Sequence, residues 1–115
     1  MIKNLSQLKK ALVPGAEFQI IAHNYHPKYV GQIRKVNIAN TMGLYSIVPD
    51  KPLSKATQAN FGKGVWLPWG KATEWEFGDD GAVTLYERGK SHTPENTIMI
   101  IRVREENNDE ARKLI

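Results

Sequence analysis

The hydrophobic positions of the chain change their period once, close to Gly15. Before it, Leu5, Leu8 and Leu12 recur at helical spacing, and this stripe predicts a short amphipathic helix over residues 4–12. Gly15 and the proline before it end the helix. A helix of this length is marginal in isolation, so we expect it to pack against the rest of the domain.

Beyond Gly15 the apolar residues follow a period of two, which predicts β-strands. Irregular spacing in the second strand predicts a β-bulge near Arg34-Lys35. Residues 40–43 and 78–81 have the composition of hairpin turns, and the last strand is hydrophobic enough to be central in a sheet. The predicted strands are residues 17–22, 29–38, 44–48, 65–67, 74–77, 82–87 and 97–103.

One long segment, residues 49–64, interrupts the alternation with prolines, glycines and polar residues. Long loops in compact domains are often functional or mobile. A short helix over residues 54–60 would fit there, with Ser54 as its N-cap. Residues 105–115 are densely charged and predict a C-terminal tail, either a frayed helix or disordered.

The order of these elements defines the expected fold class. One short N-terminal helix is followed by five to seven short strands with tight turns, so we expect a mainly β, α+β domain. Its core would be a small, strongly bent antiparallel sheet or a partly open barrel of the SH3-like or OB-like type. A chain of 115 residues fits one domain. We therefore predict a domain over residues 1–104 and a tail over 105–115.

All three tryptophans lie within ten residues, at Trp66, Trp69 and Trp75. Trp75 and Phe77 fall on one face of an alternating segment, which predicts that Trp75 is in the core. Trp66 and Trp69 are flanked by glycine, proline and lysine. They either pack in the core or form a surface on which nucleobases or a peptide stack. We keep this pair as the candidate binding surface.

The charge is distributed unevenly along the chain. Residues 1–73 hold ten Lys or Arg against two acidic residues, whereas residues 74–115 hold six against ten. An excess of positive charge favours an anionic partner for the first part. The alternative is that the lysines only solvate exposed faces of a sheet in which strands of both halves mix.

Candidate catalytic and metal-binding patterns are weak. The chain has no cysteine, no nucleophile elbow, no P-loop and no dinucleotide fingerprint. His23 and His26 would need further ligands for zinc, from His92 or from the turn carboxylates Asp79 and Asp80. These two aspartates suit a turn, and Glu74 with Glu76 suits the solvated face of a strand. We predict no catalytic activity, no metal and no cofactor.

The expected location follows from what the sequence lacks. No stretch approaches the roughly 18 apolar residues that a membrane span requires. The first residues do not have the apolar core of a signal peptide. The absence of cysteine fits a reducing compartment. We therefore expect a cytoplasmic protein with no membrane partner.

The segment from Trp66 to Phe77 resembles a pattern found in small uncharacterised proteins of Gram-positive bacteria, their phages and integrated mobile elements. In that group a Trp-Leu segment precedes a Lys-Ala-Ser/Thr-Glu-Trp-Glu-Phe-like segment, which here is residues 71–77. The first twenty residues and residues 61–87 carry the resemblance, and residues 49–61 look like an insertion. It implies a mobile-element origin and a cytoplasmic location. It brings no established activity and no functional residues.

These observations favour a non-enzymatic binding module, and nucleic acid is the expected partner. Aromatic side chains interleaved with lysines suit a barrel that follows a phosphate backbone. The alternative is a protein-interaction module that inhibits a host protein or self-associates through a sheet edge. The residues predicted to bind nucleic acid are Arg34, Lys35, Lys63, Trp66, Trp69 and Lys71.

Overall fold

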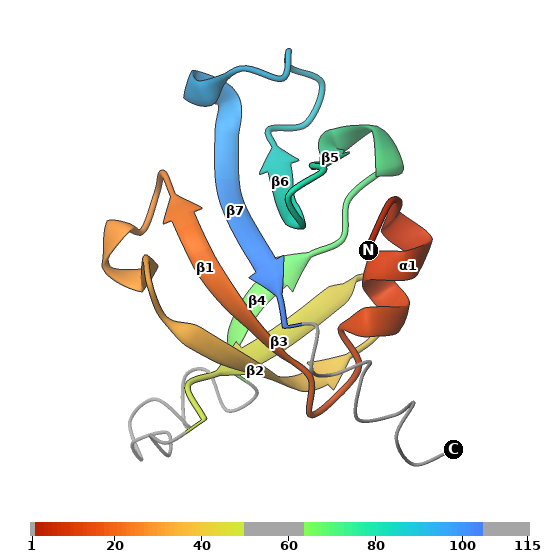
Figure 1. The fold of residues 1–115 in the computed structure, drawn as a ribbon, viewed down its shortest axis with the longest axis vertical. Coiled ribbons are helices and arrows are strands. Elements are labelled where there is room, and N and C mark those ends of the chain that lie inside the picture. The colour runs from red at the N-terminus through yellow and green to blue at the C-terminus, as the bar shows by residue number, and fades with distance from the viewer. Residues whose placement is uncertain (1, 50–63, 105–115) are drawn as a thin grey trace.

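The computed structural model describes residues 2–49 and 64–104 of the chain. In this part, one α-helix accompanies a single seven-stranded antiparallel sheet (Figure 1). The helix α1 spans Leu5–Ala11, and three short 3-10 turns are η1 (Pro27–Tyr29), η2 (Ala72–Glu74) and η3 (Pro94–Asn96). The strands are β1 (Glu17–His23), β2 (Ile33–Ala39), β3 (Gly43–Ile47), β4 (Val65–Pro68), β5 (Trp75–Phe77), β6 (Ala82–Tyr86) and β7 (Thr97–Val103).

The strand order is β4-β3-β2-β1-β7-β6-β5, so most neighbours are joined by hairpins and β1 pairs with the last strand. β2, β3 and β4 cross below β1 and β7 in Figure 1, which shows how strongly the sheet bends. The sheet does not close, because β4 and β5 are its two edges. The expected bent antiparallel sheet with one N-terminal helix is confirmed, and β7 is an interior strand as predicted.

The pairing register slips at three places. In β1 it slips between Ile20 and Ala22, and in β2 between Val36 and Ile38. β6 has a third slip near its end. The bulge predicted at Arg34-Lys35 was therefore misplaced by about two residues. Arg34 and Val36 both point inward with regular alternation, so the strand needs no correction before Val36.

The core lies between the helix and the inner face of the bent sheet. Leu5, Leu8 and Ala11 of α1 are buried in one cluster with inward side chains of β1, β3, β6 and β7. The side chain of Asn4 caps the helix by accepting a hydrogen bond from the Gln7 N–H at 2.9 Å. Among the described helices, none is long and apolar enough to cross a membrane.

Three features expected from the sequence lie outside the described residues. These are the short helix over residues 54–60, the tail over residues 105–115, and Lys63.

Candidate functional site

The outer face of the sheet, directed away from the core, carries two adjacent aromatic rings. Tyr45 of β3 is opposite Trp66 of β4 in the register, and their ring centroids lie 4.8 Å apart. Trp66 is 39% exposed. Its indole lies over Gly43, where a Cβ atom would approach the ring to 2.7 Å. The missing side chain of Gly43 therefore lets Trp66 lie close to the sheet beside Tyr45.

Cations lie on the same outer face. Lys35 of β2 is exposed, and no carboxylate of the described chain lies within ion-pair distance of it. Arg104, directly after β7, pairs with Glu17 of β1 at 2.9 Å, and Arg102 of β7 pairs with Asp80 at 3.6 Å. The outer face thus combines the Trp66–Tyr45 pair with three cations and two carboxylates. Of the predicted binding residues, Trp66 on β4 and Lys35 on β2 both lie on this outer face, with β3 between their strands.

Trp69 does not belong to this surface, and that part of the prediction was wrong. The chain turns at Gly70, whose φ is +62°, and Trp69 is 3% exposed. Its indole N–H donates to the Asn40 carbonyl at 3.1 Å, and its ring lies 6.5 Å from the ring of Trp75. Lys9 of α1 covers the Trp69 ring with its ammonium 5.9 Å from the centroid. Trp75 is in the core as predicted, at 4% exposed.

Lys71 is exposed in the turn that precedes η2. Its backbone N–H donates to the Glu74 carboxylate at 3.0 Å, and Arg88 approaches the same carboxylate at 3.6 Å. Glu74 is 8% exposed, so its predicted place on a solvated strand face was wrong. The carboxylate is used to close the turn. No ring contact or ion pair joins Lys71 to Trp66 in the described part of the chain.

A groove of about 330 Å³ opens on the inner face, at the end of the sheet where the chain passes from β1 to β2. Three rings form a cluster there: His26 lies 5.1 Å from His23 and 5.2 Å from Tyr29. Val65 to Pro68 of β4 border the opposite side. The sequence pattern had suggested His23 and His26 only as candidate zinc ligands. The spacing of two histidines and two tyrosines within seven residues was the available signal.

Arg34 lies at this groove and is 5% exposed. Because side chains alternate along β2, Arg34 points to the inner face and Lys35 to the outer face. The prediction that both act on one binding surface was therefore wrong. The Arg34 guanidinium donates to the Ser46 hydroxyl at 2.7 Å, the Ser46 carbonyl at 2.8 Å and the Gln32 side chain at 2.7 Å.

The histidines divide into two separate places. Burial, and to a lesser extent the neighbouring His26, lower the pKa of His23, whose Nδ1 accepts a hydrogen bond from the His26 N–H at 3.2 Å. His92 instead stacks on Tyr86 at the other end of the sheet, with ring centroids 4.2 Å apart. Within residues 2–49 and 64–104, no group of three or more potential ligands is placed to hold a metal ion.

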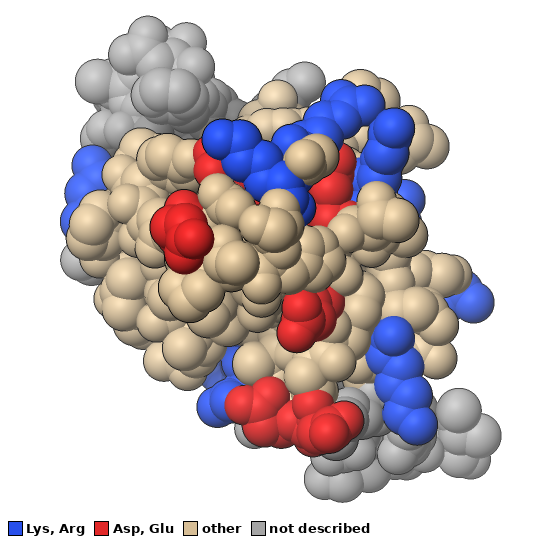
Figure 2. Space-filling view, turned by 90° about the horizontal axis from the view of Figure 1, so that it is seen from above, with Lys and Arg blue, Asp and Glu red and all other residues tan. Residues whose placement is uncertain are grey.

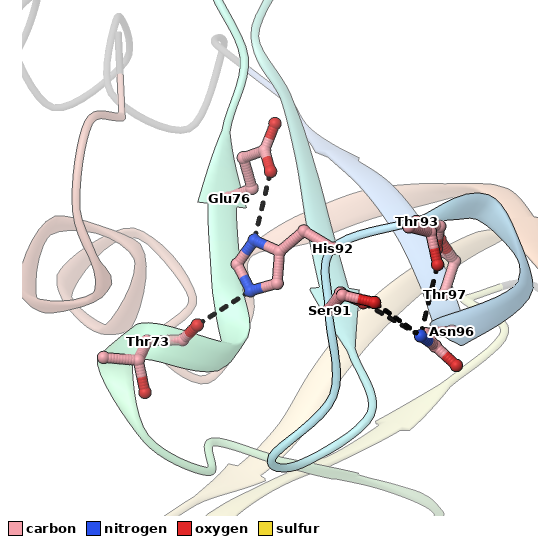
Figure 3. Close-up of polar contacts among 7 residues, drawn as sticks. All are labelled: Thr73, Glu76, Ser91, His92, Thr93, Asn96 and Thr97. Atoms are coloured by element: carbon pink, nitrogen blue, oxygen red, sulfur yellow. Dashed lines mark hydrogen bonds and ion pairs between the residues drawn. The ribbon is translucent and has the colours of Figure 1, made fainter.

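His92 fastens the loop between β6 and β7 to the edge of the sheet (Figure 3). One ring nitrogen lies 3.2 Å from the Glu76 carboxylate and the other 2.9 Å from the Thr73 carbonyl. In the same loop the Asn96 amide donates to the Ser91 carbonyl at 3.0 Å. A side-chain network therefore holds this loop in place.

We expect His92→Ala to lower the free energy of unfolding by about 1 to 2 kcal/mol, because the polar contacts of its ring with Glu76 and Thr73 and its stack on Tyr86 are lost. Urea denaturation followed by circular dichroism measures this change. Lys90→Ala in the same loop is the control, since Lys90 is exposed. Equal destabilisation by the two substitutions would contradict the fastening role of His92.

The charges at the end of the molecule that is uppermost in Figure 1 are mixed. Figure 2 shows basic and acidic side chains interleaved on that end. No continuous basic surface is visible in this view, so this end of the molecule does not resemble a phosphate-binding face. The charge excess lies in the N-terminal part of the chain: residues 2–49 hold six Lys or Arg and one Glu, and of these cations only Arg34 and Lys35 lie on strands.

Comparisons with known proteins add no further constraint on the site. No family model, curated protein or solved structure matches this chain.

Proposed function

We propose that this protein is a non-enzymatic binding module that binds single-stranded nucleic acid on the outer face of β2, β3 and β4. The observation that carries the proposal is the Trp66–Tyr45 pair, whose rings lie 4.8 Å apart on an exposed sheet face. Such rings offer stacking platforms for successive bases. Lys35 of β2 supplies positive charge for the phosphates. A cytoplasmic accessory role in a mobile element fits this proposal.

Binding is tested with a fluorescent single-stranded oligonucleotide by anisotropy, at several salt concentrations. We expect binding at low salt that weakens steeply as salt rises, because phosphate contacts release counterions. Trp66→Ala should weaken binding roughly tenfold to a hundredfold, since stacking contributes about 1 to 3 kcal/mol per base.

Two lysine variants provide matched controls for the charge. Lys35→Glu should weaken binding and flatten its salt dependence, whereas Lys90→Glu makes the same charge change in the β6–β7 loop and should have little effect. Both side chains are exposed, so neither substitution disturbs the core. If the anisotropy stayed unchanged at low salt with micromolar protein, the proposal would be wrong.

A protein partner is the second candidate, and a specific feature of the same region favours it. β4 is an edge strand, and this part of the sheet also exposes apolar side chains: Ile38 is 39% exposed and Met42 72%. An exposed edge with apolar neighbours can accept an added strand from another chain. A pull-down that retains one protein after nuclease treatment, and loses it with Trp66→Ala, would favour this candidate.

A further inference from the structure

The inner groove contains a buried positive charge that has no negative partner among the described residues. Arg34 is 5% exposed, and its described partners, Ser46 and Gln32, are neutral. Its guanidinium also lies 5.5 Å from the ring centroid of Tyr29. Burial lowers the pKa of Arg34, while Tyr29 raises it, and an arginine remains charged in proteins. Buried charges are normally paired, so this cation is well placed to attract an anion.

The guanidinium also keeps donors for such an anion. Of its five N–H groups, the Nε–H and one N–H on each Nη are used by Ser46 and Gln32. One N–H on each Nη remains without a partner in the described residues. A guanidinium with unused donors is a favoured partner for carboxylate oxygens.

The rest of the groove suits an apolar, flat body. Its walls include the rings of His23, His26 and Tyr29 and the side chain of Val65. The volume of about 330 Å³ is at the lower end of the range for small-molecule sites. Tyr25 borders the groove, and its hydroxyl donates to the Glu87 carboxylate. A ligand could therefore stack on rings while its charged group reaches Arg34.

We propose that the inner groove binds a small aromatic monocarboxylate, with the carboxylate on Arg34 and the aromatic body against His23, His26 and Tyr29. A single charge on the ligand matches the single buried cation. A phosphate would bring more negative charge than one guanidinium balances, at a greater cost of desolvation. The Trp66 indole is directed toward Gly43 and Tyr45 on the outer face, although Trp66 also borders the groove.

The probe is phenylacetate, titrated against the full chain and followed by amide chemical shifts in NMR. We expect shifts at residues of the groove, Tyr29 and Arg34 among them. The neutral isostere 2-phenylethanol should bind roughly tenfold more weakly or worse, because it cannot form the charge-assisted pair. Equal affinity for the acid and the alcohol would overturn the proposal. Tighter binding of inorganic phosphate to the same residues would overturn the monocarboxylate class.

Two kinds of variant localise the site. Arg34→Gln should weaken phenylacetate binding at least about tenfold. Val65→Trp should block the groove without removing a buried charge, and it keeps the test decisive if Arg34→Gln fails to fold. Val13→Trp places the same bulk at a position 51% exposed and not among the groove residues, and it should bind normally. Unchanged binding in folded Val65→Trp would refute the location.

Discussion

Trp69→Ala is expected to lower the free energy of unfolding by about 3 to 5 kcal/mol, the range for truncating a buried aromatic side chain. Trp69 is 3% exposed and packs beside Trp75. The substitution leaves a cavity and removes the indole donor from the Asn40 carbonyl. Since domains of this size are stable by about 5 to 15 kcal/mol, the variant should be partly unfolded near physiological temperature.

Trp66→Ala is the matched comparison for this prediction. Trp66 is 39% exposed and packs only on one side, against Gly43 and Tyr45. We expect a loss of roughly 1 to 2 kcal/mol, because much of its apolar surface is already in water. Urea denaturation of both variants measures the difference. Equal losses for the two tryptophans would mean that Trp69 is not the buried member of the pair.

Trp66 and Trp69 also show which features of this fold the sequence pattern predicts and which it does not. The leucine stripe predicted α1, and period-two alternation predicted most of the strands and the central place of β7. Alternation could not tell on which side of the sheet Trp69 lies, because the turn at Gly70 separates it from the strands on either side. Tertiary contacts with Lys9 of α1 and with Trp75 determine on which side of the sheet the Trp69 ring lies.

Arg34 was assigned to the wrong surface and Tyr45 was missed, for different physical reasons. Residue type predicted an exposed Arg34, but Ser46 and Gln32 satisfy its guanidinium inside the sheet. Tyr45 becomes a candidate site residue only through the β3–β4 register, which places it opposite Trp66. That pairing spans residues 49–64, and no local pattern fixes the register across such a segment.

Gly43→Ala should destabilise the protein by about 3 kcal/mol and disturb the outer face at the same time. A Cβ atom at this position would meet the Leu67 carbonyl oxygen and the Trp66 indole, the latter at 2.7 Å. The carbonyl belongs to the backbone of the paired strand, so β3 and β4 must separate to relieve the clash. Overpacking of this kind costs about 1 to 3 kcal/mol, and a backbone obstacle puts Gly43 at the upper end.

Gly43→Ala should also change the structure locally, at β3 and β4. Hydrogen exchange of the β3 and β4 amides should accelerate. Oligonucleotide binding should weaken, because the added methyl group displaces the Trp66 ring from its position over Gly43. Gly81→Ala is the control: its φ is +85°, but no atom lies within 4 Å of the added Cβ. It should cost only about 1 kcal/mol of backbone strain and leave β4 protection unchanged. If the β4 amides of Gly43→Ala exchanged at the wild-type rate, the two strands would not pack this closely. The position of the Trp66 ring over Gly43 would then be wrong.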